Sequence, residues 1–280
     1  MYFKILGEDL TYNGYTYHEG LNIDPNPFDP TPDYGNGLFF ADEKEILRFC
    51  DYGTKIAEVA IPDGEAVVPV GEEYKAHRII LGPVRELWTK ETFEWIISCG
   101  ADVHADDDYA LICASEKGDD EVVRLLLASG ANIHALNDLP LCLAAENGNL
   151  EIVKYLVAKG AHIHADDDFA LRWAAENGHL DVVRLLVESG ADVHIRDDFA
   201  LCWASAKGHM DVVRLLIESG ANVHARNNFA LHWASRNGHM DVVRFLVESG
   251  ANIHADNDCA LRWASENGHL EVVEYLKSLY

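Results

Sequence analysis

Apolar, glycine and polar positions repeat every 30 residues along the last two-thirds of the chain. One column of this pattern is leucine and the column seven residues later is glycine: Leu111, Leu141, Leu171, Leu201, Leu231 and Leu261, with Gly118, Gly148, Gly178, Gly208, Gly238 and Gly268. A second glycine column follows at Gly130, Gly160, Gly190, Gly220 and Gly250. Such self-similarity is typical of a solenoid, in which each unit buries its apolar face only against its neighbours.

Each unit is predicted to hold two helices and a loop. In the third full unit, an apolar stripe that includes Leu171 ends at Gly178, a residue suited to a left-handed helix C-terminus. A second helix carries Asp181 in its first turn, where a carboxylate favours the positive end of the helix dipole, and stops at Gly190. Residues 191–198 are then expected to return as an extended loop.

The unit resembles the ankyrin repeat at most of that family's diagnostic positions. ALxWA stands where the family has TPLHxA, NGHLDVVRLL and ESGADVH follow, and one unit keeps the family proline at Pro140. The family unit has about 33 residues, and the residues missing here fall between ADVH and the next helix. We therefore expect a mainly α fold, an ankyrin-repeat solenoid of helix pairs with shortened hairpin loops, preceded by a small α+β domain.

The periodic pattern is confined to the C-terminal part of the sequence, which predicts a two-domain chain. A small α+β domain is expected over residues 1–85 and an ankyrin-repeat domain over residues 86–280. The repeat domain would comprise a half-repeat at 86–108, full repeats at 109–138, 139–168, 169–198, 199–228 and 229–258, and a truncated C-terminal cap at 259–280.

The first 85 residues lack the period and hold seven of the eight prolines. Short β-type runs at 37–40, 55–60 and 66–70 alternate with turns, and one helix is predicted at 43–51. The stretches YNGYTYHEGLNID, GLFFADEKEILRFCDYG and AHRIILG resemble the module that precedes ankyrin arrays in giant DNA viruses of the mimivirus type. This resemblance implies a viral protein acting inside a host cell, in the host cytoplasm or in the virion, and implies no established chemistry.

Composition narrows the classes of partner. A net charge of −25 argues against binding to nucleic acid or anionic lipid. It would attract a basic protein, although large acidic charge also serves solubility. No run approaches the roughly 18 apolar residues of a membrane span, and six cysteines without CxxC spacing suit small buried hydrophobes in a reducing compartment. We expect an intracellular protein with a protein partner and no cofactor; its oligomeric state does not follow.

Acidic and histidine columns invite a chemical interpretation. Asp108, Asp138, Asp168, Asp198, Asn228 and Asp258 precede the first helices and are good N-cap types, so we interpret them as structural. Histidines recur in ADVH-type motifs, from His104 to His254, and in NGH motifs, from His179 to His269. Helices pack about 8–10 Å apart, too far for equivalent histidines to share zinc at bonds of about 2.0 Å, so no metal site is expected.

A tryptophan column is the first candidate for a binding surface. It consists of Trp173, Trp203, Trp233 and Trp263, and the two earlier repeats have Cys113 and Leu143 instead. The ankyrin resemblance places this helix on the concave side of the array, and tryptophan frequently anchors interfaces. Packing between repeats is the alternative, because the family often has leucine here.

Positions that vary between repeats are the second candidate, since positions free of packing can differ. In the first helix these include Arg172, His232 and Arg262, and in the acidic loops Arg196 and Arg226. Together with the tryptophans they form the predicted partner-binding surface.

Catalytic signatures such as a phosphate loop, GxSxG or HExxH are missing from the sequence. We expect a non-enzymatic scaffold that binds a host or viral protein through the concave face. One alternative is an enzyme or effector domain targeted by the array, with Asn22, Asp24, Glu43 and the 35–37 turn around a pocket. A deep polar pocket there would favour it, whereas the scaffold hypothesis expects none. The other alternative is a ubiquitin-ligase substrate adaptor, but no F-box-like segment follows the array.

Overall fold

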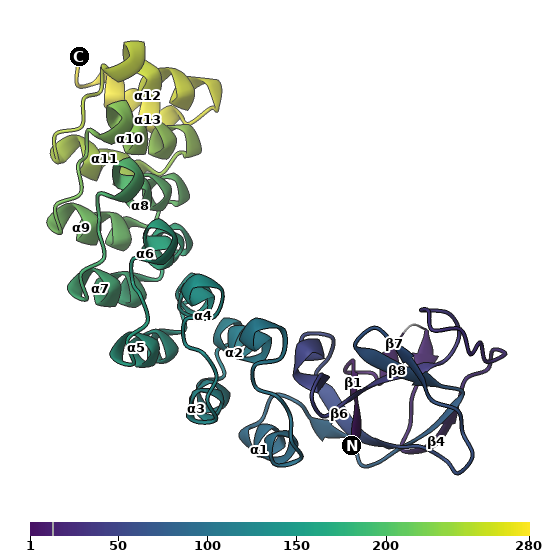
Figure 1. Cartoon of the computed structure of the whole chain (residues 1–280). Coiled ribbons are helices and arrows are strands. Elements are labelled where there is room, and N and C mark those ends of the chain that lie inside the picture. Colours follow the sequence, from purple (N-terminus) through teal and green to yellow (C-terminus); the bar gives the residue numbers. More distant parts are fainter. Residues whose placement is uncertain (13) are drawn as a thin grey trace. The chain divides into compact units, whose positions relative to one another are not determined.

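A computed structural model of the chain describes residues 1–12 and 14–280. The chain separates into two compact units, Met1–Leu136 and Asn137–Tyr280 (Figure 1). The packing boundary lies beyond residue 85 because the short 3₁₀ helix η1 (Ile46–Phe49) packs against helix α2 (Ala105–Lys117). The domain boundary inferred from the repeat pattern stays a prediction.

The first unit is built on an antiparallel sheet. Its strand order is β4-β9-β6-β1-β5-β8-β7, with β10 paired to β6, while β2 and β3 form a separate hairpin. The strands are β1 (Tyr2–Leu6), β2 (Thr11–Tyr12), β3 (Tyr15–Thr16), β4 (Gly20–Ile23), β5 (Leu38–Asp42), β6 (Lys55–Ala60), β7 (Val68–Val70), β8 (Glu73–Ala76), β9 (Arg78–Leu81) and β10 (Arg85–Glu86).

Strand β1 lies in the middle of this sheet, between β6 and β5, and four of its five residues are buried. It pairs with β6 in the register Tyr2↔Val59 to Leu6↔Lys55 and with β5 at Tyr2↔Asp42. The runs expected at 37–40, 55–60 and 66–70 correspond to β5, β6 and β7. The helix expected at 43–51 is only η1, one short 3₁₀ helix, although its inward residues are buried as expected: Ile46, Leu47 and Cys50.

The first helices of the repeat pattern complete this unit. Helix α1 (Lys90–Ser98) begins after Thr89, whose hydroxyl accepts a hydrogen bond from the backbone N–H of Thr92. Its apolar face buries Phe93 and Ile96, as the expected half-repeat requires. Helices α2 and α3 (Asp120–Ala128) follow as the first full pair.

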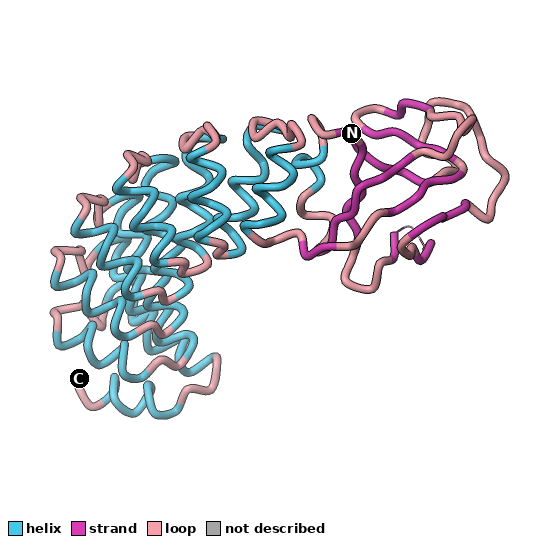
Figure 2. The backbone as a smooth tube through the Cα atoms, turned by 90° about the horizontal axis from the view of Figure 1, so that it is seen from below, coloured by secondary structure: helices cyan, strands magenta, loops and turns pink. Residues whose placement is uncertain are grey.

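The second unit is a stack of helix pairs in two rows. First helices α6, α8, α10 and α12 pack on one another, as do second helices α5, α7, α9, α11 and α13 (Figures 1 and 2). The helices are α4 (Ala135–Glu146), α5 (Leu150–Ala158), α6 (Ala165–Asn177), α7 (Leu180–Glu188), α8 (Ile195–Lys207), α9 (Met210–Glu218), α10 (Ala225–Asn237), α11 (Met240–Glu248), α12 (Ala255–Glu266) and α13 (Leu270–Lys277). The leucine column is buried between repeats except at Leu261 in the last repeat, which is half-buried, and the predicted solenoid of helix pairs is confirmed.

The connection between repeats differs from the expected extended loop. Three consecutive residues just inside the N-terminal bound of each first helix adopt the left-handed conformation, so the regular right-handed helix begins only after them. In α8 these residues are Arg196, Asp197 and Asp198, with φ of 51°, 57° and 55°. Aspartate and asparagine dominate these positions because their short polar side chains tolerate this region best. The family hairpin is thus shortened to a single left-handed turn, which accounts for the 30-residue unit.

Candidate functional site

The acidic column at the end of each left-handed turn links neighbouring repeats. Oδ1 of Asp198 accepts a hydrogen bond from the backbone N–H of Asn222, 2.7 Å away in the next repeat, and lies 3.1 Å from His194 Nδ1. Asp108, Asp168 and Asn228 make the equivalent pair of contacts. The column is structural, but the expectation that it caps helices was wrong, because its side chains point to the following loop.

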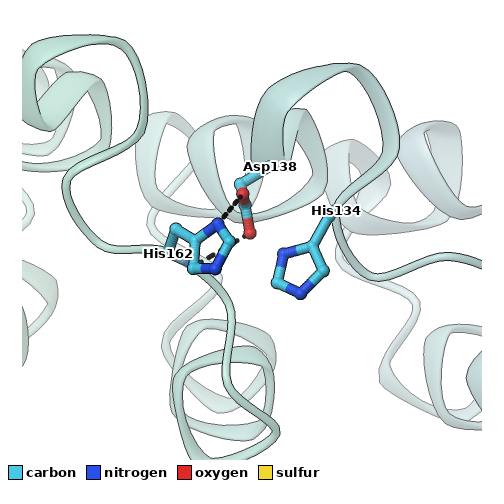
Figure 3. A group of neighbouring side chains, drawn as sticks. All are labelled: His134, Asp138 and His162. Carbon is cyan, nitrogen blue, oxygen red and sulfur yellow. Dashed lines mark hydrogen bonds and ion pairs between the residues drawn. The ribbon is translucent and has the colours of Figure 1, made fainter.

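Asp138 shows the same link in the second unit (Figure 3). Its carboxylate is 1% exposed and accepts a hydrogen bond from the backbone N–H of His162 at 2.8 Å, while His162 Nδ1 lies 3.1 Å from Oδ2. The contact is therefore explained as a link between loops.

The NGH histidines also link repeats. Nε2 of His179 lies 2.9 Å from the carbonyl oxygen of Glu146, and Nε2 of His209 lies 2.9 Å from that of Glu176. Each glutamate is near the C-terminal end of the first helix in the preceding repeat. The ring covers a glycine: a Cβ on Gly178 would lie 2.5 Å from His209 Nδ1. The same contact explains four members of the glycine column sterically, Gly148, Gly178, Gly208 and Gly238, whereas a Cβ on Gly268 would meet nothing within 4 Å. It agrees with a structural role for these histidines.

The tryptophan column is half-buried along the first helices. Trp203 and Trp233 stack with ring centroids 6.3 Å apart, and Trp233 meets Trp263 edge-on at 5.7 Å. Between the stacked rings of Trp203 and Trp233 the space is no more than about 10 Å³. Each ring therefore packs on its neighbours and keeps part of its surface in solvent.

The first two tryptophans are arranged differently. An open pocket of about 250 Å³ separates Trp173 from Trp203, lined also by Arg172, Glu176 and Phe199. A gap of this size between two indoles accommodates an apolar or aromatic side chain, and such sites concentrate binding energy at interfaces.

The phenylalanines that precede the tryptophans by four residues were missed by the sequence analysis. Phe169 and Phe199 contact Trp173 and Trp203 at 5.3 and 5.7 Å between centroids. The i,i+4 spacing on one helix face was the available signal, because such residues are neighbours on a helix. The two rings also flank the Arg172 guanidinium, at 5.4 and 5.6 Å.

Two of the variable positions are buried. Arg172 is 6% exposed, and its guanidinium donates hydrogen bonds to the carbonyl oxygens of Asp166 and Asp167, both at 2.8 Å. His232 is 2% exposed, and burial lowers its pKa. The premise that these positions are free of packing is therefore wrong: Arg172 closes the left-handed turn of its own repeat, and His232 stays neutral in the core.

The other variable positions are accessible. Arg196 and Arg226 reach back one repeat to Asp167 and Asp197, with shortest N–O distances of 2.9 and 3.8 Å. Both arginines keep 40% or more of their side chains exposed. Arg262 is also exposed. These residues can exchange their present contacts for a partner at small cost, because exposed ion pairs contribute only about 0–1 kcal/mol.

The cysteines of the first helices are packing residues. Burial raises the pKa of the Cys142 and Cys202 thiols to about 12. Both thiols therefore stay protonated and unreactive at neutral pH, because the thiolate is the reactive form. This agrees with the interpretation of cysteine as a small hydrophobe.

The first unit contains a polar pocket, which the scaffold hypothesis did not expect. Asp24, Gly35, Asn36 and Gly37 line it, as the alternative hypothesis required, and its volume is about 320 Å³. Asn22 is fully buried instead, with its amide bonded to the backbone of His18 and Gly20. Glu43 lies elsewhere and pairs with the N-terminal amine of Met1.

Comparison with known proteins agrees with this repeat architecture. The model of the family described as ankyrin repeats matches residues 87–167, 137–197, 163–227 and 201–279. The chain belongs to the ankyrin-repeat family. Ankyrin repeats are a general protein–protein interaction motif, so the family supports a binding function for the array.

Several relatives come from the same giant virus. The ankyrin repeat proteins R896 and R838 of Acanthamoeba polyphaga mimivirus are 33% and 35% identical over 131 and 143 residues, or 44% and 45% of this chain. The chain spans about half of their length, 40% and 52% respectively. An uncharacterized mimivirus protein, R869, is 34% identical over 44% of this chain and 94% of its own length. The resemblance to ankyrin proteins of the mimivirus type is confirmed.

The structure adds one observation on membranes. Among the residues it describes, no helix combines the length and the apolar character that crossing a bilayer requires.

Proposed function

We propose that the protein is a non-enzymatic scaffold that binds a host or viral protein through the concave face of its ankyrin array. The observation that carries this proposal is the open pocket between Trp173 and Trp203. Two half-buried indoles that leave a gap of side-chain size form a ready anchor site, because tryptophan is enriched among residues that dominate binding energy. Trp233 and Trp263 extend the same aromatic surface.

The partner would insert an apolar or aromatic side chain between the indoles and place basic residues around it. The exposed carboxylates of Asp167 and Asp197 lie in the left-handed turns of neighbouring repeats, with side chains 54% and 77% exposed. The net charge of −25 adds long-range attraction for a basic surface. Arg196, Arg226 and Arg262 supply positive charges among these carboxylates. Arg172 supports the surface from beneath by holding the left-handed turn of its repeat, and His232 supports it by packing in the core.

The viral relatives support a place of action inside an infected host cell, and we propose the host cytoplasm or the virion. The six cysteines are free and five of them are buried, which suits a reducing compartment. The partner can therefore be sought by affinity purification of the full chain from infected cells, followed by mass spectrometry.

Leucine at two tryptophan positions tests the anchor. Leu143 occupies this column naturally in the second full repeat, so Trp173→Leu with Trp203→Leu should preserve the stack. We expect the double variant to lose at least tenfold in affinity for the purified partner, since anchors contribute about 2 kcal/mol or more.

The matched control is Arg184→Ala on the exposed face of a second helix, which should bind as the wild type does. Both variants should keep the wild-type helix content and melting temperature. Unchanged affinity in the double leucine variant would refute the tryptophan surface as the binding site.

The pocket in the first unit favours a second function for that domain. Among its described lining residues, Asp24 is the one with a charged side chain, and none is a histidine, cysteine, serine or lysine. This lining offers recognition groups more than the base and nucleophile of a hydrolase or transferase. We therefore propose a ligand-binding role for the pocket beside the scaffold function.

A further inference from the structure

The pocket of the first unit is enclosed by three segments that lie apart in the sequence. The β2–β3 hairpin contributes Tyr12 and Tyr15, the segment after β4 contributes Asp24, and the segment before β5 contributes Tyr34 and Asn36. Its volume of about 320 Å³ lies within the range of small-ligand sites, about 300–1,000 Å³. We refer to this site as the tyrosine pocket.

Aromatic rings form much of its wall. Tyr12, Tyr15, Tyr17 and Tyr34 line it together with Phe39. Tyr15 and Tyr17 meet edge-on at 4.7 Å between centroids, and Tyr34 stacks on Phe39 at 5.9 Å. The faces of such rings carry negative electrostatic potential, so a cage of them attracts a cation.

Asp24 adds a formal negative charge. Its side chain is 6% exposed, and Oδ1 accepts hydrogen bonds from the backbone and the amide of Asn26, at 2.8 and 3.0 Å. In the described part of the chain, Oδ2 has no hydrogen-bond partner, although the carboxylate lines the pocket. An oxygen of this carboxylate without a protein donor is available to accept a hydrogen bond from a ligand or to face its positive charge.

Two of these rings, those of Tyr12 and Tyr17, already contact an amine of the same domain. Lys4 Nζ lies 4.3 Å from the ring centre of Tyr12 and 4.6 Å from that of Tyr17. Lys4 is not among the residues that line the tyrosine pocket, so it contacts these rings from outside it. No cation of the described chain lies against Tyr15 or Tyr34, which leaves those two rings and Asp24 to a ligand.

We infer that the tyrosine pocket binds an organic ammonium cation, of the class of a substituted ammonium compound or a methylated lysine side chain. Anionic ligands are disfavoured because no basic side chain is among the described lining residues. Quaternary ammonium groups are recognised by this combination of aromatic faces because their charge is diffuse and weakly hydrated. The inference concerns the first domain and does not depend on the partner of the ankyrin array.

Choline and its uncharged tert-butyl isostere provide the decisive comparison, because they share shape and differ in charge. Isothermal titration calorimetry of the full chain should show choline binding at least about tenfold tighter than the isostere, as expected for a cation–π site with a carboxylate. Equal affinities for the two compounds, or no binding of any cation tested, would overturn the inference.

A second arm distinguishes the source of the cation. A short peptide with one trimethyllysine is titrated beside the same peptide with unmodified lysine. Tighter binding of the trimethyllysine peptide than of choline assigns the pocket to a protein side chain, and the reverse order assigns it to a free small molecule. Either order supports the ammonium site.

Two variants locate the binding. Asp24→Asn removes the charge and keeps an oxygen acceptor for Asn26, and Tyr34→Ala removes a ring that is 71% exposed. Each should weaken choline binding by about tenfold or more. The controls Asp63→Asn and Tyr52→Ala change exposed residues outside the lining, and both should bind choline as the wild type does.

The two proposals can fail separately. The double leucine variant of Trp173 and Trp203 should bind choline normally, since the array does not contribute to the pocket lining. If Asp24→Asn lost its fold, Tyr34→Ala and the isostere comparison would still decide the question. Undiminished choline affinity in a folded Tyr34→Ala variant would refute the pocket as the site.

Discussion

Oδ1 of Asp198 lies 2.7 Å from the backbone nitrogen of Asn222, 24 residues later in the next repeat. The same oxygen lies 3.1 Å from Nδ1 of His194, four residues earlier. One carboxylate oxygen thus fixes its own loop and the following loop together. Because Asp108, Asp138, Asp168 and Asn228 make the equivalent bond, the loops are connected along the array.

Removal of one such link should destabilise the array. Asp198→Ala leaves the Asn222 N–H without its acceptor and places alanine at a left-handed position, so we expect a loss of about 1–3 kcal/mol in the free energy of unfolding. Asp198→Asn is the matched control, because Asn228 makes the equivalent link: its amide oxygen accepts a hydrogen bond from the backbone N–H of Asn252 at 2.8 Å. Urea denaturation followed by circular dichroism measures both, and equal losses would contradict the proposed link.

The glycine columns allow steric crowding to be separated from backbone strain. Gly178 has φ of 79°, and a Cβ there would lie 2.5 Å from His209 Nδ1, whereas Gly220 has φ of 102° and nothing within 4 Å. Both alanine variants suffer the backbone cost of about 1–2 kcal/mol, and only Gly178→Ala must also displace the histidine. Thermal denaturation should therefore show a lower melting temperature for Gly178→Ala than for Gly220→Ala.

Lys4 should make stability depend on pH. Burial lowers its pKa from 10.5 to about 7, so the unfolded chain binds more protons than the folded chain between these values. The free energy of unfolding should therefore rise with pH across this window, with no further contribution below it, where both states are protonated. Lys4→Met should flatten this rise by about 2–4 kcal/mol between pH 7 and pH 10.

The exposed Lys44→Met serves as the control for Lys4, because it removes the same charge without a buried group. Urea denaturation at several pH values measures the slope for each variant. If Lys4→Met kept the wild-type slope, the lysine would not titrate as its burial requires.

Arg196 separates a binding role from a stabilising one. Its guanidinium pairs with Asp167 at 2.9 Å, but the two side chains are 49% and 54% exposed. Such a pair contributes about 0–1 kcal/mol, so Arg196→Ala should leave the melting temperature nearly unchanged. Under the proposed function the same variant should weaken partner binding, and Arg244→Ala on a second helix should not. A large fall in melting temperature would show that Arg196 is a structural residue.

The helices of the array could be predicted closely, because their signals are local. Gly178 and Gly190 mark the ends of α6 and α7 through backbone conformations that the sequence alone makes recognisable. The role of Asp198 could not be predicted in this way, since its partner Asn222 becomes a neighbour only when repeats stack. The burial of Arg172 could not be predicted for a related reason: a position also varies between repeats when one side chain makes a contact that only its own repeat requires.

By itself, the sequence determined the family, the 30-residue unit and the apolar faces that stack. The reason is that apolar residues recur at fixed spacings, which mark the buried face of each helix. The tertiary structure decided which surfaces remain available. A pocket separates Trp173 from Trp203, whereas Trp203 and Trp233 stack on each other, although all three residues are tryptophans. The tertiary structure also gathered Tyr15, Asp24 and Tyr34 around one pocket, because sheet pairing and loop paths bring together groups that no local pattern connects.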